Sequence, residues 1–254
     1  MGLIYRERFT IPYSMSDVSH RANLPALLGE CISVSGRQSI ALDNSDDKVF
    51  EKYGLVWIIT EHEIQVTDRL PFLYEEVIIE TEAIAYNKFF CYRDFRVFDK
   101  EENLLLTIQT TFALLDWESR KVQPVLDEIV APYESTFEKR LRRGEKFSEL
   151  DDVQVEDYRV RFYDIDMNGH VNNSRYIDWV YDVLGYDFLQ KHIPRSLRIK
   201  YSKEVAPGGW VQSAFHMDGL VTQHEIRSQG QVNAQAKIIW EEESSVKEGE
   251  GYDL

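Results

Sequence analysis

Three polar residues at two-residue intervals form the part of the sequence best suited to chemistry. In the segment YDIDMNGHVNN a carboxylate stands at Asp166, an amide at Asn168 and an imidazole at His170. In an extended segment this spacing points the three side chains to one side. An imidazole and a carboxylate can move a proton, and an amide can hold a water molecule or an oxyanion. The asparagines that follow are typical of a helix start, whose free N–H groups can polarise a carbonyl oxygen.

Each of these residues has a simpler interpretation when it is taken alone. Aspartate and asparagine are frequent in turns and helix caps, and a single histidine is usually structural. We interpret Asp164 in this way, as a structural residue of the loop, and Tyr176 and Trp179 as the core face of the following helix. A metal site built from His170 and nearby acids is a further alternative at this point.

The same segment has a weaker counterpart near the start of the chain. With an offset of 150 residues the two copies share a tyrosine, a histidine and an asparagine: Tyr13 with Tyr163, His20 with His170, and Asn23 with Asn173. Around both copies the order of elements is a strand, a loop, one helix and several strands, which indicates an internal duplication. In this alignment Ser16 and Val18 replace Asp166 and Asn168, so the first copy is expected to be catalytically silent.

Most of the remaining sequence favours β-strands. β-Branched, aromatic or alternating residues predict strands at residues 77–81, 89–98, 104–115, 197–201, 210–215 and 231–240. Helical periodicity is confined to residues 23–40 and 173–191. One long helix followed by long antiparallel strands predicts an α+β fold in each copy, with the helix covering one face of the sheet.

Two motifs together resemble a known family. The first is Asp-x-Asp-x-Asn-x-His-Val-Asn-Asn, which begins at Asp164 and is followed by Tyr176-Ile177-x-Trp179; the second is Tyr201-Ser-Lys-Glu204-Val205. Both are similar to stretches of the plant and bacterial acyl-acyl-carrier-protein (acyl-ACP) thioesterases. The resemblance covers essentially the whole chain. It implies two tandem hot-dog folds, each a long antiparallel sheet wrapped around a central helix, which pair within one chain. It implies no cofactor and no metal ion.

The resemblance also implies roles for single residues. The catalytic positions of the family fall on Asp166, Asn168, His170 and Glu204. The cysteine that follows the glutamate in plant members is Val205 here, so no cysteine nucleophile is present at that position. Two routes stay open. Either water attacks the thioester with His170 or Glu204 as general base, or Asp166 or Glu204 attacks first and forms an acyl anhydride.

Domain boundaries follow from the repeat. We expect an N-terminal hot-dog domain at residues 1–126, a linker at 127–150, a catalytic hot-dog domain at 151–243 and a flexible tail at 244–254. The resemblance implies that the first domain holds the acyl chain between its helix and its sheet. The apolar stripe that would line this site, and that would equally suit an ordinary helix core, consists of Leu24, Leu27, Leu28 and Val34.

The charge of the chain restricts its partners. Twenty-nine basic and 44 acidic residues give a net charge of -15, which disfavours binding to nucleic acid or anionic membranes. No stretch reads as a signal peptide or membrane span, and two cysteines form no disulfide framework, so we expect a cytoplasmic protein. The acyl carrier protein is acidic. A basic cluster in the linker either docks it or is simply solvated: Lys139, Arg140, Arg142, Arg143 and Lys146.

Three functions are compatible with these features. The favoured one is hydrolysis of fatty acyl-ACP to free fatty acid and carrier protein in fatty acid biosynthesis, by a monomeric pseudo-dimer or a homodimer. An acyl-CoA thioesterase of the same fold would be favoured by a compact phosphate-binding pocket of arginine and lysine, and no such motif stands in the sequence. A non-catalytic acyl-binding protein would not need the acid–base residues of the second copy.

Overall fold

The first half of the chain forms one long helix and five long strands. The computed structural model describes residues 2–142, 144–148, 150–166 and 168–243. Strand β1 (Ile4–Thr10) leads through the turn η1 (Tyr13–Met15) into helix α1 (Leu24–Ala41), and the short helix α2 (Asp46–Tyr53) follows. The other long strands are β2 (Leu55–Val66), β3 (Glu76–Tyr86), β4 (Phe90–Asp99) and β5 (Leu104–Asp116).

The second half repeats this order of elements. Strand β8 (Gln154–Arg159) leads through η3 (Phe162–Asp164) into α4 (Asn173–Asp182), and the short helix α5 (Tyr186–Leu189) follows. The remaining strands are β9 (His192–Tyr201), β10 (Trp210–Asp218), β11 (Val221–Ser228) and β12 (Gln231–Glu242).

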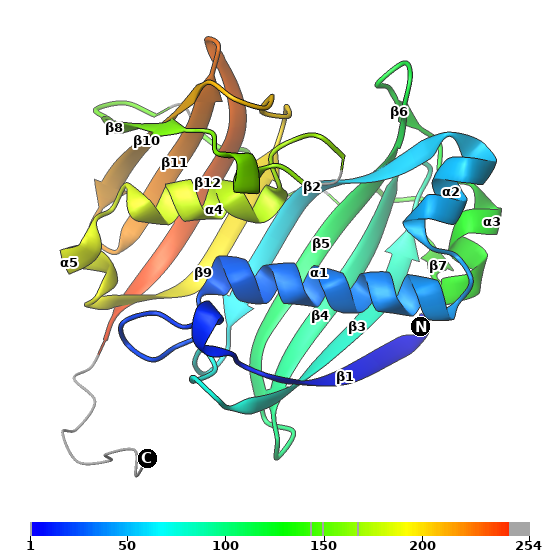
Figure 1. Ribbon diagram of the computed structural model, residues 1–254, viewed down its shortest axis with the longest axis horizontal. Coiled ribbons are helices and arrows are strands. Elements are labelled where there is room, and N and C mark those ends of the chain that lie inside the picture. The colour runs from blue at the N-terminus through cyan, green and yellow to red at the C-terminus, as the bar shows by residue number, and fades with distance from the viewer. Residues whose placement is uncertain (1, 143, 149, 167, 244–254) are drawn as a thin grey trace.

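All of these strands belong to one sheet. Its order is β1-β3-β4-β5-β2-β9-β12-β11-β10-β8, so the strands of the first half lie on one side of the β2–β9 pair and those of the second half on the other. Figure 1 shows α1 and α4 on the same face of this sheet, one over each half. Each half is therefore a hot-dog fold, and the two form one continuous sheet around two central helices.

The two halves are joined by the pairing of β2 with β9. Five residue pairs are in register, from Glu61 opposite Lys200 to Gln65 opposite Ser196. On the helix-covered face Ile64 and Leu197 are buried, and on the other face Arg198 lies 3.3 Å from Glu63. Each strand would otherwise expose a row of unpaired backbone groups. This one ladder therefore completes both sheets.

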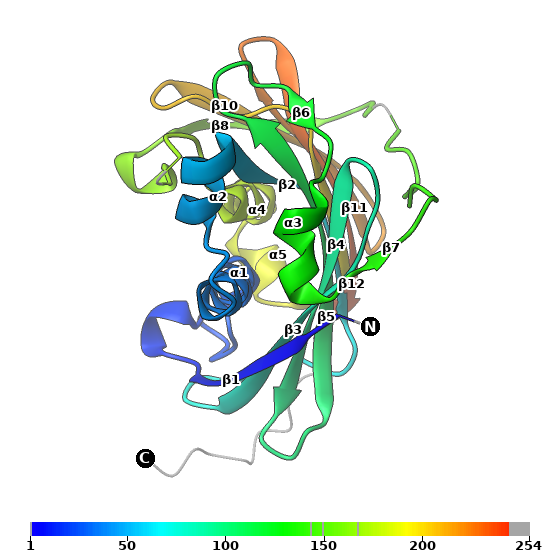
Figure 2. The same cartoon turned by 90° about the vertical axis from the view of Figure 1, so that its right-hand side faces the viewer.

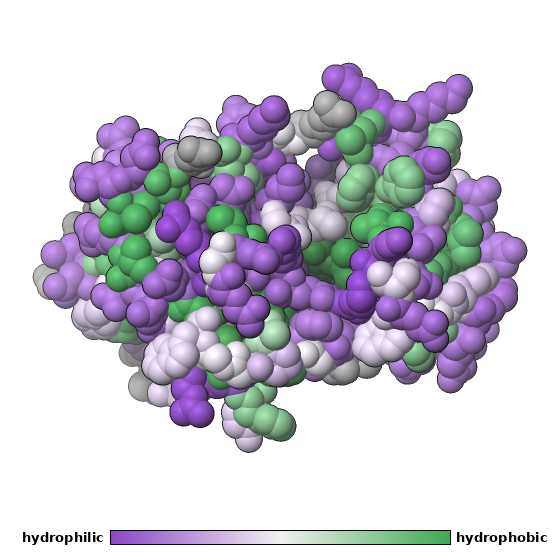
Figure 3. Space-filling view, turned by 90° about the horizontal axis from the view of Figure 1, so that it is seen from above, coloured by the Kyte–Doolittle hydropathy of each residue, from purple (hydrophilic) through white to green (hydrophobic). Residues whose placement is uncertain are grey.

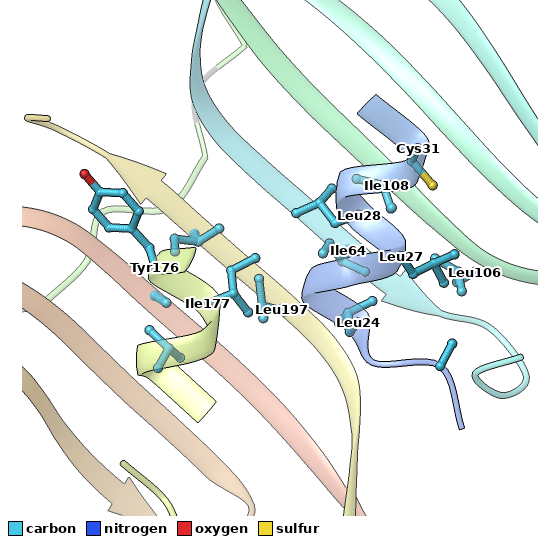
Figure 4. Close-up of a cluster of buried hydrophobic side chains, with 14 of the residues drawn as sticks. Leu24, Leu27, Leu28, Cys31, Ile64, Leu106, Ile108, Tyr176, Ile177 and Leu197 are labelled. Atoms are coloured by element: carbon cyan, nitrogen blue, oxygen red, sulfur yellow. The ribbon is translucent and has the colours of Figure 1, made fainter. Parts of the chain in front are cut away.

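The core lies between the helices and the joined sheet. Figure 4 shows Leu24, Leu27 and Leu28 of α1 and Ile177 of α4 directed toward sheet residues. A single hydrophobic cluster contains residues of both halves, and Ile64 and Ile199 in it are 0% exposed. The two hot-dog units therefore share one core, and each removes apolar surface of the other from water.

The helix predictions were accurate in one half and too long in the other. Helix α1 begins after Asn23, whose side-chain oxygen accepts the Ala26 N–H at 3.1 Å, as expected for a helix cap. The second predicted helix breaks after Asp182, because Gly185 adopts φ of 80° and starts the separate turn α5. None of the helices in the described part of the chain is both long and apolar enough to cross a membrane.

The duplication is present, but its register differs from the sequence alignment. The helix caps are Asn23 and Asn172, which gives an offset of 149 residues. The turns before them also match at this offset, since His20 and Gly169 both have positive φ, of 58° and 79°. Matching His20 with His170 was therefore wrong by one residue. The backbone turn, not the histidine side chain, is what the two copies share.

The segment between the halves is partly structured. It carries β6 (Val122–Gln123), α3 (Asp127–Val130), η2 (Ala131–Tyr133) and β7 (Thr136–Phe137), and Ile129, Val130 and Tyr133 are buried. The first part of the predicted linker thus packs on the first half. Figure 2 shows the following stretch on the side of the sheet away from α1 and α4. The predicted tail, residues 244–254, lies outside the described residues.

The shared ladder predicts that neither half is stable by itself. Residues 1–148 and 149–254 expressed separately should aggregate, because each exposes the edge of β2 or β9 and part of the shared core. Co-expressed, they should form a soluble one-to-one complex, as measured by size-exclusion chromatography with light scattering. Two stable, monomeric halves would contradict the account.

Burial of His62 at the junction predicts an acid-sensitive fold. Its Nδ1 lies 2.8 Å from Oγ1 of Thr110, and burial lowers the pKa of His62 to about 3. Above pH 6.5, the pKa of His62 in the unfolded chain, the neutral imidazole makes its full contribution to stability. This contribution is lost as the pH falls toward 3. Between pH 7 and pH 5 the loss should be about 2 kcal/mol.

The free energy of unfolding in urea, measured for the parent chain and for His62→Gln at pH 7 and pH 5, checks this predicted loss. On acidification the free energy of unfolding of the variant should fall by about 2 kcal/mol less than that of the parent. His216→Gln is the comparison variant, because the His216 side chain is not buried. Equal pH dependence of the parent and His62→Gln would contradict the assignment.

Candidate active site

The three predicted polar residues lie in a tight turn between η3 and α4. The Asp166 N–H donates to the His170 carbonyl at 2.8 Å, and the Gly169 N–H donates to the Asp166 carbonyl at 3.0 Å. Gly169 adopts φ of 79°, a conformation that glycine takes without steric cost. The extended segment expected from the sequence is therefore wrong, and the two-residue spacing does not align the three side chains.

Asp164 holds the start of this turn. Its carboxylate is buried and accepts the Arg161 N–H at 2.7 Å and the Arg161 guanidinium at 2.9 Å. Its backbone carbonyl accepts the Asn172 N–H at 2.8 Å. The interpretation of Asp164 as a structural loop residue is confirmed.

His170 pairs with Glu204, which follows the end of β9. Nε2 of His170 lies 3.2 Å from Oε2 of Glu204, and the two side chains are 30% and 43% exposed. Nδ1 of His170 is buried and has no hydrogen-bond partner among the residues described. The contact between the two side chains is therefore made through Nε2 of His170.

The backbone around Glu204 is fixed by three hydrogen bonds. The Val205 N–H donates to the Tyr176 hydroxyl oxygen at 2.9 Å, and Nδ2 of Asn233 donates to the Glu204 carbonyl at 3.2 Å. The Val171 N–H donates to the Val205 carbonyl at 3.3 Å. Burial raises the pKa of Tyr176 to about 12, so this hydroxyl stays protonated at neutral pH. Tyr176 thus supports Glu204 from the core face of α4.

Arg120, from the first half of the chain, completes the cluster. It lies in the turn between β5 and β6, and its Nη2 is 2.5 Å from Oε1 of Glu204 and also contacts Oε2. The guanidinium lies 5.7 Å from the ring centroid of Trp117. Sequence reasoning missed Arg120, because it stands 84 residues before Glu204 and no local motif marks it. Only the strand order brings the two together.

Asp166 and Asn168 contact each other within the turn. Oδ1 of Asp166 accepts the Asn168 N–H at 2.8 Å, and Asn168 is exposed. The turn is also tied to the first half, since Nδ2 of Asn173 donates to the Ile59 carbonyl of β2 at 3.4 Å. The structure thus brings His170 and Glu204 together directly. It keeps Asp166 and Asn168 in the adjoining turn.

The equivalent loop of the first half keeps the turn. In the corrected register Asp17 matches Asp166, and its Oδ1 likewise accepts a backbone N–H, that of Ser19 at 2.8 Å. The Asp17 N–H donates to the Arg21 carbonyl at 2.9 Å, as the Asp166 N–H does to that of His170. The sequence alignment paired Ser16 with Asp166 and Val18 with Asn168. Both pairings are therefore wrong by one residue. The carboxylate is retained.

Among its described residues, the first half has no counterpart of the His170–Glu204 contact. Arg21 stands where the second half has His170. The Ala22 N–H donates to the Pro71 carbonyl at 2.7 Å, as Val171 does to Val205, which places Leu70 at the position of Glu204. A guanidinium is not a general base and a leucine carries no proton acceptor.

The predicted acyl-binding stripe is buried, and Leu24 also borders a cleft between the two halves. Each of its four side chains is at most 2% exposed: Leu24, Leu27, Leu28 and Val34. A cavity of about 100 Å³ lies instead under the second part of α1, which contributes Ile32, Ser35, Gly36 and Ser39 to its wall. Across it lie Trp57, Arg93 and Phe112 of the sheet. The buried Arg93 donates to Oε1 of Gln38 at 2.6 Å.

The predicted basic cluster lies in the segment on the helix-free side of the sheet. Lys139, Arg140 and Lys146 are exposed there, and Arg143 lies outside the described residues. Arg142 is held by the chain itself, since it donates to Glu138 at 2.7 Å and lies 4.6 Å from the ring centroid of Tyr92.

Fold and site together define a class of protein. It is a tandem hot-dog protein in which His170 and Glu204 are in contact where the turn of the second half meets the first half. The sequence matches the acyl-ACP thioesterase N-terminal domain over residues 2–133 and the acyl-ACP thioesterase C-terminal domain over residues 147–242. The chain belongs to the acyl-ACP thioesterase family.

Solved structures share the fold of this chain over nearly its whole length. A Lactobacillus plantarum protein, provisionally described as an oleoyl thioesterase, is 31% identical, with a TM-score of 0.89 over 95% of this chain and 97% of that one. The 12:0-ACP thioesterase of Umbellularia californica is 20% identical, with a TM-score of 0.83 over 95% and 98% of the two chains.

Curated relatives include a chloroplastic palmitoyl-acyl carrier protein thioesterase of Gossypium hirsutum, 24% identical over 78% of this chain and 50% of that protein. A chloroplastic oleoyl-acyl carrier protein thioesterase of Coriandrum sativum is 24% identical over 80% and 60%. The chain spans about half the length of the curated relatives it matches.

Proposed function

We propose that this protein hydrolyses the thioester of fatty acyl-ACP and releases free fatty acid and the carrier protein. The observation that carries the proposal is the His170–Glu204 pair, 3.2 Å apart and accessible to solvent, in a chain of the acyl-ACP thioesterase family. A panel of acyl-ACPs and acyl-CoAs of graded chain length tests it directly. Turnover of acyl-ACP is expected, and its complete absence across the panel would overturn the proposal.

The proposed chemistry centres on Glu204. Its carboxylate either takes a proton from water as the oxygen bonds to the thioester carbon, or bonds to that carbon itself and forms an anhydride that water then cleaves. In both routes the carbon–sulfur bond breaks and the carrier leaves as a thiol. His170 would orient Glu204 and exchange protons with it, while the exposed Asn168 side chain would hold the oxyanion.

In this proposal the two halves of the chain have different roles. Residues 151–243 carry the chemistry, and residues 1–126 hold the acyl chain in the cavity under α1. Figure 3 shows hydrophobic residues around a recess near the middle of the upper face, which would suit the entry of an acyl chain. At about 100 Å³ the cavity is smaller than typical ligand pockets of about 300 Å³ or more. A long acyl chain would therefore need neighbouring side chains to move.

The proposed roles of His170, Glu204 and Asn168 predict that single substitutions strongly lower turnover. His170→Ala, Glu204→Gln and Asn168→Ala should each lower turnover about a hundredfold or more without changing the melting temperature greatly. His20→Ala, in the first-half loop, is the control and should leave the chemical step intact. A folded His170→Ala protein with normal kcat would refute the site.

The cavity under α1 predicts a substitution that shortens the preferred acyl chain. A Cβ at Gly36 meets no atom within 4 Å, so Gly36→Leu can fill the cavity without a backbone clash. Stability should hold or rise by up to about 1 kcal/mol, because leucine favours helix. The ratio of kcat/KM for long over short acyl-ACPs should fall about tenfold or more.

Gly29 provides the matched control for this experiment. It lies in the same helix, also has no atom within 4 Å of a Cβ, and is not part of the cavity wall. Gly29→Leu should leave chain-length preference unchanged. If both variants or neither variant shifted the preference, the acyl chain would lie elsewhere.

We further propose that the exposed linker cations contact the acidic carrier. Replacing Lys139, Arg140 and Lys146 together by alanine should raise KM for acyl-ACP roughly three- to tenfold and weaken its salt dependence. Hydrolysis of a small uncharged thioester should not change. Equal losses on both substrates would assign the cluster a structural role instead.

A further inference from the structure

A β-bulge in β12 lies directly beside the segment that carries Glu204. Strand β12 is next to β9 in the sheet (Figure 1), and their ladder ends at the pair Tyr201 and Ala234. On the other side of β12 the register with β11 shifts, and Asn233 is the extra residue, which stands opposite no residue of β11. A bulged residue can direct its backbone and side chain away from its ladder. Because Asn233 is only 3% exposed, its polar groups need partners within the protein.

These partners lie mainly in the segment after β9. The Asn233 carbonyl accepts the Ser202 N–H at 2.8 Å and the Lys203 N–H at 3.2 Å. Nδ2 of Asn233 donates to the carbonyls of Lys203 at 3.4 Å and Glu204 at 3.2 Å, and its Oδ1 accepts the Ser228 hydroxyl at 2.8 Å. Since a carbonyl oxygen can only accept, the amide nitrogen must be the atom that faces Glu204. One buried side chain thus holds the backbone of Glu204 where the strand ladder has ended.

The first half contains the same bulge with a different residue. Leu105 of β5 is the extra residue where the register with β4 shifts, and it is 1% exposed. Its carbonyl accepts the N–H groups of Thr67 at 2.9 Å and Asp68 at 3.2 Å, as the Asn233 carbonyl does after β9. The bulge and its carbonyl are therefore common to both halves of the fold, and a leucine can form them. Of the two bulges, only the one beside Glu204 carries an amide.

We propose that Asn233 is a positioning residue, whose amide sets the Glu204 carboxylate against His170. The inference rests on the proposed function for its reaction. The peptide unit between Glu204 and Val205 is held at its carbonyl by Asn233 and at its N–H by the Tyr176 hydroxyl. Fixing this backbone limits where the exposed carboxylate can lie and keeps it 3.2 Å from Nε2 of His170.

Asn233→Leu tests the role of the amide, because it gives the second bulge the residue type of the first. The variant should fold and melt within a few degrees of the parent. Its kcat for acyl-ACP should fall about ten- to a hundredfold while KM changes less than about threefold, because the amide acts on Glu204 and not on the substrate. Asn44→Leu is the matched control and should keep its kcat. Nδ2 of Asn44 likewise donates to a backbone carbonyl, that of Ile129 at 2.8 Å.

A milder variant covers the case in which Asn233→Leu does not fold. Ser228→Ala leaves Asn233 in place and removes the bond that its Oδ1 accepts, so kcat should fall about threefold with KM unchanged. If Asn233→Leu is unfolded, a normal kcat for Ser228→Ala overturns the inference.

The double variant Asn233→Leu, Glu204→Gln separates positioning from a general loss of structure. If Asn233 acts through Glu204, the double variant should match Glu204→Gln within about a factor of two. A normal kcat for folded Asn233→Leu, an equal fall for Asn44→Leu, or multiplicative losses in the double variant would overturn the inference. Any of these results with an active parent contradicts only the role of Asn233, whereas a parent without acyl-ACP hydrolysis contradicts the proposed function.

Discussion

The pairing of β2 with β9 is the constraint on which the rest of the molecule depends. A hot-dog sheet leaves one long edge unpaired, and an unpaired edge invites association with other chains. Here the partner edge is supplied by the second half of the same chain through five residue pairs. The pairing also merges the two hydrophobic cores, with Ile64 and Ile199 buried at the seam. Stability and architecture therefore cannot be assigned to either half alone.

The same pairing builds the candidate active site. The turn that carries His170 belongs to the second half, but Arg120 of the first half contacts Glu204, and β2 accepts a hydrogen bond from Asn173. Duplication followed by divergence explains the asymmetry. Both loops keep the same turn and the same aspartate, while only the second keeps a histidine and a glutamate in contact.

The sequence predicted the features that are encoded locally. Helix α1 was placed within one residue, because Asn23 is a strong cap, and the motif residues His170 and Glu204 were found by pattern. Strand β2 was missed, because Glu61 and Glu63 interrupt its apolar pattern. Their charges are compensated by Arg198 of the other half, which lies 2.5 Å and 3.3 Å from them.

Three other features depended on information that no local pattern carries. Arg120 joins the site only through the strand order. The register of the repeat is set by backbone turns, so an alignment of matching histidines was shifted by one residue. The cavity under α1 is lined by the second part of that helix and not by the predicted leucines, because those side chains are buried in the core. In each case the missing information was which distant segments pack together.

The central claim is that the first half completes the active site of the second, and a double-mutant cycle between Arg120 and Glu204 tests it most directly. The measurement is kcat/KM for acyl-ACP in Arg120→Ala, Glu204→Gln and the double variant. If Arg120 acts through Glu204, its removal should have little further effect once Glu204 is replaced, so the double variant should match Glu204→Gln within about a factor of two. Arg195, equally exposed at 34% and paired with Glu241, is the control, and its replacement should combine independently with Glu204→Gln. Independent, multiplicative losses for Arg120 and Glu204 would contradict a site shared between the two halves.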